Sequence, residues 1–118
     1  MADSGLFIGF GGSVRGRERQ ALTVFGEALE YFSRLQQEGQ IESFEPVSLE
    51  PHGGDLDGFI LLRGDQDKLA RIRGSDEFQR LVARGELIVD SLAVVAAGLG
   101  ERLSAELSVF SQQLDELT

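Results

Sequence analysis

Two short segments, Gly5–Phe10 and Asp57–Arg63, are apolar at consecutive positions instead of at alternate ones. Apolar runs of this length next to glycine-rich turns are typical of β-strands that are covered on both faces. Such strands are expected at the centre of a sheet. This pattern constrains the fold more than any other, because other protein surfaces must pack against both faces of the central strands.

Helical periodicity separates the two runs. Residues 17–37 carry apolar side chains every three or four positions, and Gly39 follows as a predicted C-cap. A second helical region is predicted over residues 66–73 behind the N-cap Asp65; it breaks at Gly74 and resumes after Ser75. The stripe expected to face the core in the first helix consists of Leu22, Phe25, Leu29, Phe32 and Leu35.

The remaining segments predict two more strands and a last helix. Ile41–Glu50 is predicted to be an edge strand with a bulge at Pro46, because proline cannot donate a hydrogen bond to a neighbouring strand. Ile88–Gly98 is the predicted fourth strand, and Glu101–Leu117 is a predicted amphipathic helix. The apolar stripe of this last helix consists of Leu103, Leu107, Phe110, Leu114 and Leu117.

This order of elements predicts an α+β protein with the ferredoxin-like βαββαβ sandwich and an extra C-terminal helix. We expect one domain over residues 1–118, with residues 1–4 as a disordered tail. The helices of this fold cover one sheet face, and a large exposed apolar patch is uncommon on a monomer. We therefore expect a homodimer packed sheet to sheet, with the last helix embracing the partner. In the alternative, the chain's own last helix folds back and covers this sheet face.

The composition excludes several classes of function. The net charge of −9, from 20 acidic and 11 basic residues, opposes binding to nucleic acid or to an anionic membrane. The chain has no cysteine, so disulfides and thiolate metal sites are excluded. No apolar stretch has the length of a membrane span, and the N-terminal residues lack the pattern of a signal peptide. These features predict a cytoplasmic protein, and the preference for arginine over lysine is typical of a bacterial one.

Several segments resemble known proteins. Gly16-Arg17-Glu18 ahead of the long helix, Leu56–Leu62 and Ser75–Gln79 resemble the dimeric α/β-barrel superfamily of ferredoxin-like proteins. Glu50–Asp55 is similar to a segment of small bacterial hypothetical proteins without a known function. The resemblance extends over nearly the whole chain and implies a dimeric α/β barrel. The superfamily includes cofactor-free monooxygenases, EthD-like proteins, and dechlorinating and haem-degrading enzymes, so it leaves the function open.

Three polar residues are candidates for catalysis: His52, Tyr31 and Arg63. His52 is the only histidine, and a neutral imidazole can act as a general base near neutral pH. One histidine makes a poor metal site without a nearby carboxylate, which Asp55 or Asp57 could supply; we predict no metal centre. The alternative roles are a solvated turn residue for His52, a packing residue for Tyr31 and an ion-pair partner for Arg63.

A glycine-rich turn followed by arginines is a candidate anion-binding site. Backbone amides at a helix N-terminus attract negative charge, and glycines allow close approach. We expect the helix to begin at or after Gly16, and Arg15 or Arg17 to meet a carboxylate or a bound anion. The alternative is a tight turn whose arginines pair with surface acids. The candidate residues are Gly11, Gly12, Ser13, Arg15 and Arg17.

Two hypotheses about function follow. The first is a dimeric protein that binds a small, largely apolar ligand; the second is a cofactor-independent monooxygenase that uses His52, Tyr31 and Arg63. Neither requires a cofactor. The second requires at least two of these three side chains to face one cavity. Leu6–Gly9 and Gly58–Leu61 are weakly similar to the strands of RNA-recognition motifs, but the acidic charge opposes RNA binding.

Overall fold

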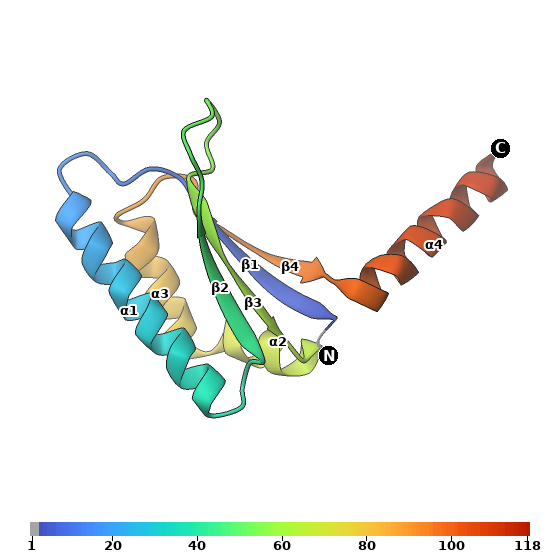
Figure 1. Cartoon of the computed structure of the whole chain (residues 1–118), viewed down its shortest axis with the longest axis horizontal. Coiled ribbons are helices and arrows are strands. Elements are labelled where there is room, and N and C mark those ends of the chain that lie inside the picture. The colour runs from blue at the N-terminus through green and yellow to red at the C-terminus, as the bar shows by residue number, and fades with distance from the viewer. Residues whose placement is uncertain (1–2) are drawn as a thin grey trace.

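The computed structural model describes residues 3–118 and contains four strands and four helices (Figure 1). The predicted strand-helix-strand-strand-helix-strand order is confirmed, with the second helical region divided in two. The elements are β1 (Ser4–Phe10), α1 (Glu18–Gln37), β2 (Ser43–Ser48), β3 (Gly58–Gly64), α2 (Gln66–Gly74), α3 (Asp76–Glu86), β4 (Ala93–Gly98) and α4 (Gly100–Leu117).

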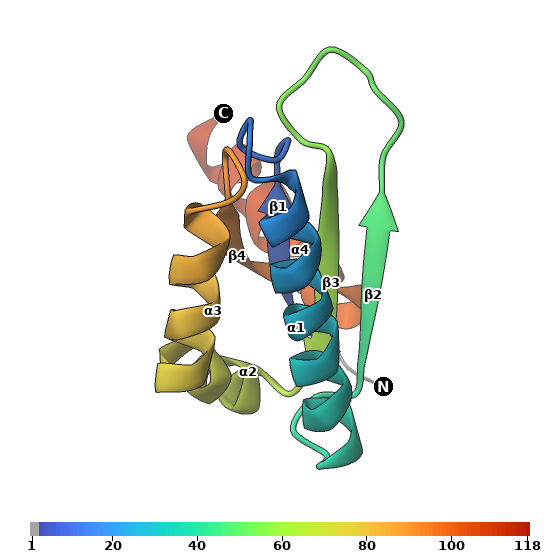
Figure 2. The ribbon, with the colours of Figure 1, turned by 90° about the vertical axis from the view of Figure 1, so that its left-hand side faces the viewer.

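The four strands form one antiparallel sheet in the order β2-β3-β1-β4. The two runs of consecutive apolar residues, β1 and β3, are therefore central, as predicted. Figures 1 and 2 show α1 and α3 on one side of the sheet, and Figure 2 places α4 behind it. We call the side that faces α1 and α3 the helix face, and the other side the open face.

The core fills the helix face. Leu6 and Ile8 of β1 pack there against Leu62 of β3 and the aromatic rings of Phe32 and Phe78 from the helices. Phe32, Phe78 and Leu62 are almost completely inaccessible to solvent. These contacts fix the distance between the sheet and the helix layer.

The ends of the helices follow the predicted signals. The Asp65 side chain accepts a hydrogen bond from the backbone of Lys68 at 3.1 Å, and Ser75 caps α3 by accepting from Phe78 at 3.3 Å. Gly39 has a φ of 75°, the left-handed conformation that ends many helices. These residues thus separate the helices where the sequence indicated.

The predicted buried stripe of α1 is wrong in its N-terminal half. Leu22 is 74% exposed and Phe25 is also exposed, whereas Tyr31, which is not part of the predicted stripe, lies in the core. Leu22 and Phe25 line a cavity between α1 and the sheet, where neither side chain is fully enclosed. Most buried residues of α1 lie in its C-terminal half, and Val24 is the one buried residue of its N-terminal half.

Two strand predictions also need correction. β4 begins at Ala93 instead of Ile88, because Val89 forms an isolated bridge with Ser13 and the chain then turns through Ser91, which has a φ of 55°. The predicted bulge at Pro46 is absent from the pairing of β2 with β3. Leu49 donates its backbone N–H to the carbonyl of Asp57, just before β3. Backbone N–H groups alternate in direction along a strand, so the nitrogen of Pro46 faces the free edge, where no hydrogen bond to β3 is lost.

The predicted disordered tail over residues 1–4 is corrected at Ser4. Met1 and Ala2 lie outside the described residues, but Ser4 begins β1 and pairs with Gly64 and Gly98. Its buried hydroxyl accepts a hydrogen bond from Arg102 at 3.0 Å. The strand therefore begins one residue earlier than predicted, because both neighbouring strands extend to this point.

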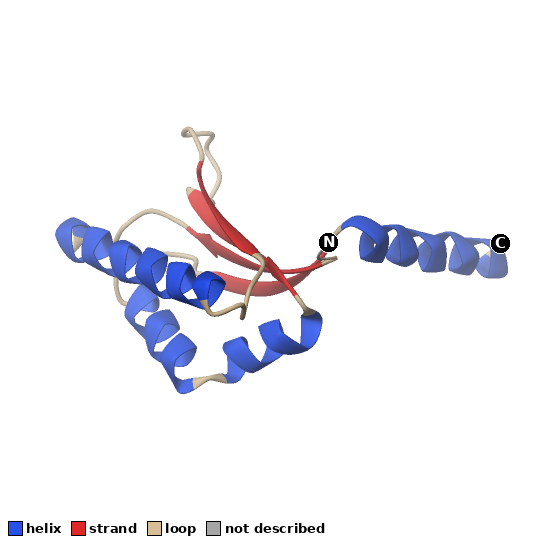
Figure 3. Cartoon of the chain, turned by 60° about the horizontal axis from the view of Figure 1, so that its bottom comes forward, coloured by secondary structure: helices blue, strands red, loops and turns tan. Residues whose placement is uncertain are grey.

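The last helix does not cover the open face of its own chain. α4 projects away from the sheet on the side opposite α1 and α3, and none of its residues is buried (Figures 1 and 3). The radius of gyration is 16.3 Å, whereas a compact chain of this length is expected at about 13.5 Å. The alternative in which α4 folds back over its own sheet is therefore wrong.

Two leucine-to-alanine substitutions test which face of α1 is buried. Leu35→Ala removes a side chain that is 8% exposed and should lower the free energy of unfolding by about 2–5 kcal/mol. Leu22→Ala on the same helix should change it by less than about 0.5 kcal/mol. Urea denaturation measures both, and equal losses would contradict the assigned face.

Candidate functional site

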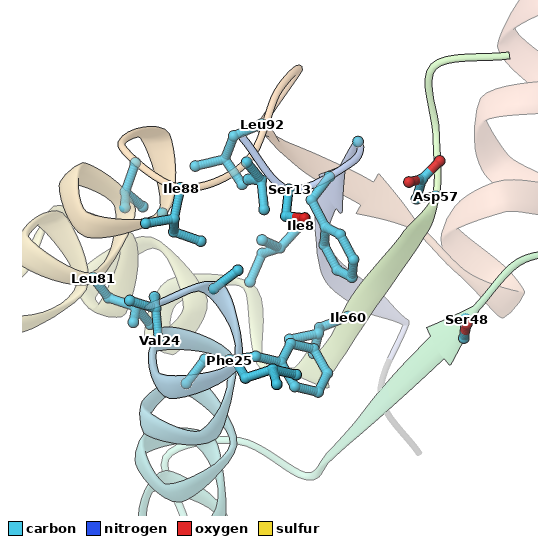
Figure 4. Close-up of a pocket in the computed structure, with 18 of the residues that line it drawn as sticks. Ile8, Ser13, Val24, Phe25, Ser48, Asp57, Ile60, Leu81, Ile88 and Leu92 are labelled. Atoms are coloured by element: carbon cyan, nitrogen blue, oxygen red, sulfur yellow. The ribbon is translucent and has the colours of Figure 1, made fainter. Parts of the chain in front are cut away.

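A cavity of about 470 Å³ lies between the helix face of the sheet and helices α1 and α3 (Figure 4). Its walls are almost entirely apolar. Apolar cavities of this size are the usual form of small-molecule sites. The apolar side chains in the walls include Ile8, Phe10, Val24, Phe25, Phe32, Ile60, Phe78, Leu81, Val82, Ile88 and Leu92.

Small residues on the helices leave this space open. Ala21 and Ala28 of α1 line the cavity where larger side chains would fill it, and Gly85 of α3 lines it next to Leu92. Phe10 and Phe25 contact each other edge to face, with ring centroids 6.0 Å apart, and both rings lie in the wall. The cavity is therefore bounded by aromatic rings, whose flat faces suit another flat apolar molecule.

Polar groups in the cavity wall are few, and Asp57 and Ser48 lie at its rim, away from the cluster of apolar side chains (Figure 4). Asp57 is exposed at the start of β3, and its backbone N–H donates to Phe10 at 2.8 Å. Glu18 already accepts hydrogen bonds from the backbone N–H of Gly16 at 3.0 and 3.2 Å. A bound molecule would therefore meet apolar walls inside and hydrogen-bonding groups at the rim.

None of the three predicted catalytic residues lines this cavity. His52 lies in the exposed loop between β2 and β3. Its Nδ1 accepts from the backbone N–H of Gly54 at 3.2 Å, so its Nε2 must donate to the carbonyl of Leu56, which is 2.6 Å away. Both ring nitrogens thus stabilise the loop.

Arg63 and Tyr31 lie on opposite faces of the sheet. Arg63 is on the open face, where it pairs with Glu45 of β2 at 3.3 Å. Tyr31 lies in the core on α1, with the guanidinium of Arg34 5.3 Å from its ring centroid. The structure therefore does not bring His52, Tyr31 and Arg63 together.

Burial raises the pKa of the Tyr31 hydroxyl. The nearby Ser75 hydroxyl acts in the opposite direction, and the negative charge of Glu77 raises the pKa further. Arg34 forms an ion pair with Glu77, and this hydrogen bond raises the pKa of the guanidinium. Tyr31 is therefore a neutral core residue at physiological pH.

The glycine-rich turn has the backbone conformation that the sequence predicted. α1 begins at Glu18, and Gly16 precedes it with a φ of 88°. The Arg17 guanidinium donates to the carbonyl of Leu87 at 2.9 Å, at the C-terminal end of α3. None of the ion pairs found within residues 3–118 involves Arg15 or Arg17.

Backbone groups of this turn are engaged within the chain. Gly11 donates to Asp90 at 2.7 Å, and Gly12 accepts from the same residue at 2.9 Å. Ser13 forms the bridge to Val89 and also lines the cavity. Anion binding at this turn stays a prediction. The observed contacts connect the turn to the segment that follows α3.

In the part of the chain that the structure describes, no group of three or more His, Cys, Asp or Glu residues could hold a metal ion. Over the same residues, no helix is both long enough and apolar enough to cross a membrane. The apolar cavity between the sheet and helices α1 and α3 is the candidate functional site, on the basis of its volume and lining.

Comparison with solved structures identifies the fold. A DABB-family protein from Mesorhizobium loti has a TM-score of 0.65 and 14% identity, with 85% of this chain and all of that chain covered. A dimeric protein of unknown function with a ferredoxin-like fold from Bacteroides fragilis has a TM-score of 0.58 and 13% identity, covering 81% of this chain and 96% of that one. SnoaB, a cofactor-independent oxygenase from Streptomyces nogalater, has a TM-score of 0.54 and 15% identity, covering 84% and 95%.

The chain has the ferredoxin-like fold. This result confirms the fold that the resemblance to the dimeric α/β-barrel superfamily implied. No protein-family model matches the sequence, and no curated protein matches it significantly. At these low identities the ferredoxin-like fold is shared, and the activity of a similar structure does not follow for this chain.

The raised pKa of Tyr31 predicts how stability depends on pH. The unfolded chain loses the phenolic proton near the ordinary pKa of 10.0, whereas the folded chain retains it to higher pH. The folded state then binds more protons, so stability should fall as pH rises above about 10. Urea denaturation at pH 9 and 11 should show a smaller fall for Tyr31→Phe than for the wild type. An equal fall in both proteins would contradict the assignment to Tyr31.

Proposed function

We propose that the protein is a homodimer whose cavity between the sheet and α1 and α3 binds a small, largely apolar molecule. The observation that supports this proposal is the apolar cavity of about 470 Å³, which has the volume of sites for small organic ligands. Part of the apolar wall is exposed to solvent. A bound apolar molecule would remove that surface from water, which is favourable.

The arrangement of polar groups suggests how the ligand lies. Its apolar part would contact the rings of Phe10, Phe25 and Phe32, and a hydroxyl or amine would hydrogen-bond to Ser13 or Asp57. The carboxylates of Glu18 and Asp57 would repel an anionic ligand. We therefore expect neutral or cationic apolar molecules to bind more tightly than carboxylates of the same size.

The homodimer is supported by the chemistry of the open face. Phe7 and Phe59 lie side by side there, with ring centroids 5.1 Å apart, and Val95 is 51% exposed beside them. A contiguous apolar surface of this kind marks an interaction site. The Bacteroides fragilis protein of the same fold is described as dimeric.

A second candidate is a cofactor-independent oxygenase, because SnoaB shares the fold. In such an enzyme the cavity would hold the substrate. The polar side chains that line it belong to Ser13, Glu18, Ser48 and Asp57, since His52, Tyr31 and Arg63 lie outside the cavity. The absence of nucleic-acid binding and the cytoplasmic location stay predictions from the sequence.

Ligand binding can be tested with N-phenyl-1-naphthylamine, a neutral apolar dye whose fluorescence rises in apolar sites. We expect saturable binding of one dye per chain. Ala21→Trp, which fills the cavity from α1, should weaken binding at least about tenfold, or about 1.4 kcal/mol. Ala83→Trp on the exposed side of α3 is the matched control and should leave binding unchanged. Equal binding by both variants would exclude the cavity as the dye site.

The sheet-to-sheet dimer can be tested at two adjacent positions of β4. Val95 points to the open face because it pairs with Phe7, and Ala96 points to the helix face because it pairs with Leu6; both are exposed. Val95→Asp should dissociate the dimer in sedimentation equilibrium, because it buries a charge in the interface. Ala96→Asp carries the same charge and should remain dimeric. A dimer that tolerates Val95→Asp would exclude the open face as the interface.

A further inference from the structure

The most exposed large apolar surface of the molecule belongs to α4. Leu103, Leu107, Phe110, Leu114 and Leu117 are between 48% and 85% exposed. Isolated exposed apolar residues are common, but five on one helix face require an explanation. No other element of the described chain packs extensively against α4 apart from β4, next to its first turn.

The stripe has the pattern of a helix that packs against another protein surface. Its apolar positions are separated by four, three, four and three residues, the spacing of a packing seam along a helix. Ser104 and Ser111 flank the stripe on one side, so no charge opposes close approach there. Asp115 and Glu116 lie away from the seam. The helix therefore has a distinct face for contact and another for solvent.

The position of α4 indicates which surface it contacts. It leaves the end of β4 and extends beyond the open face, on the side where a second copy would pack (Figures 1 and 3). Arg102 fixes its first turn by donating to Ser4 at 3.0 Å and by its ion pair with Glu106. Its 18 residues span about 27 Å, which exceeds the separation of about 10 Å between two stacked sheets.

The solved structures of similar fold are shorter than this chain. The Mesorhizobium loti protein is covered completely, although the match includes only 85% of the present chain. The unmatched share is 15% of 118 residues, or about 18 residues.

The flat footprint of the open face is smaller than the surface that a typical stable dimer buries. Strands of six or seven residues in a four-stranded sheet have a footprint of about 400 Å², whereas a stable dimer buries about 800 Å² on each partner. A helix about 27 Å long and about 10 Å wide adds about 270 Å². Together the two surfaces approach the area that a stable dimer requires.

We propose that α4 is a dimerisation arm that packs its apolar stripe along the flank of a second copy of this chain. This inference rests on the proposed sheet-to-sheet dimer. The arm extends outward beside the open face. Each copy therefore contributes both its open sheet face and the apolar stripe of α4 to the dimer interface. The two arms of a twofold dimer would clasp opposite sides of the assembly.

The test compares two double variants that add the same charge to α4. Leu107→Glu with Leu114→Glu places both charges in the stripe, and Ser108→Glu with Gln112→Glu places both on the solvent face. Neither variant disturbs a buried residue of the single chain, so both should fold. We expect sedimentation equilibrium to show a dimer dissociation constant at least about 100-fold higher for the stripe variant, with the control within about threefold of wild type.

The outcomes separate this inference from the proposed dimer. An unchanged dissociation constant in the stripe variant would overturn the role of α4 and leave the sheet-to-sheet dimer standing. A wild type that is monomeric at all concentrations would overturn both. Flotation of the wild type with phosphatidylcholine vesicles, lost in a stripe variant that still dimerises normally, would assign α4 to a lipid surface and overturn the inference.

Discussion

The pairing of β1 with β3 at the centre of the sheet is the constraint on which the rest of the structure depends. Each of these strands has apolar side chains on both faces, so Leu6 and Leu62 bury one face against the helices while Phe7 and Phe59 occupy the other. The hydrophobic effect stabilises the first set within a single chain. Phe7 and Phe59 gain the same stabilisation only when another protein surface covers them. Folding and assembly therefore depend on the same two strands.

The cavity results from uneven packing on the helix face. Phe32 and Phe78 fill the space near the C-terminal half of α1, whereas Ala21 leaves it open near the glycine-rich turn. The packing of the helices against the sheet thus stabilises the fold at one end and leaves a cavity that can hold a ligand at the other. The open face is left for assembly, because the cavity lies on the other side of the sheet. Ligand binding and dimerisation can therefore be altered separately.

Features determined by a few neighbouring residues were predictable from the sequence, whereas those set by packing between elements were not. The caps at Asp65 and Ser75 and the end of α1 near Gly39 depend on local chemistry. Leu22 and Phe25 fit the period of the α1 stripe, but their exposure depends on the gap beneath them.

The same limit applies to the site. His52 and Tyr31 carry functional groups, yet loop contacts occupy one and the core encloses the other. The cavity is formed by small residues from α1 and α3, which have no distinctive pattern in the sequence. The central claim is that a second copy covers the open face. Sedimentation equilibrium of the wild-type chain at micromolar concentration tests it most directly: the account predicts twice the mass of one chain, and a mass equal to one chain would contradict it.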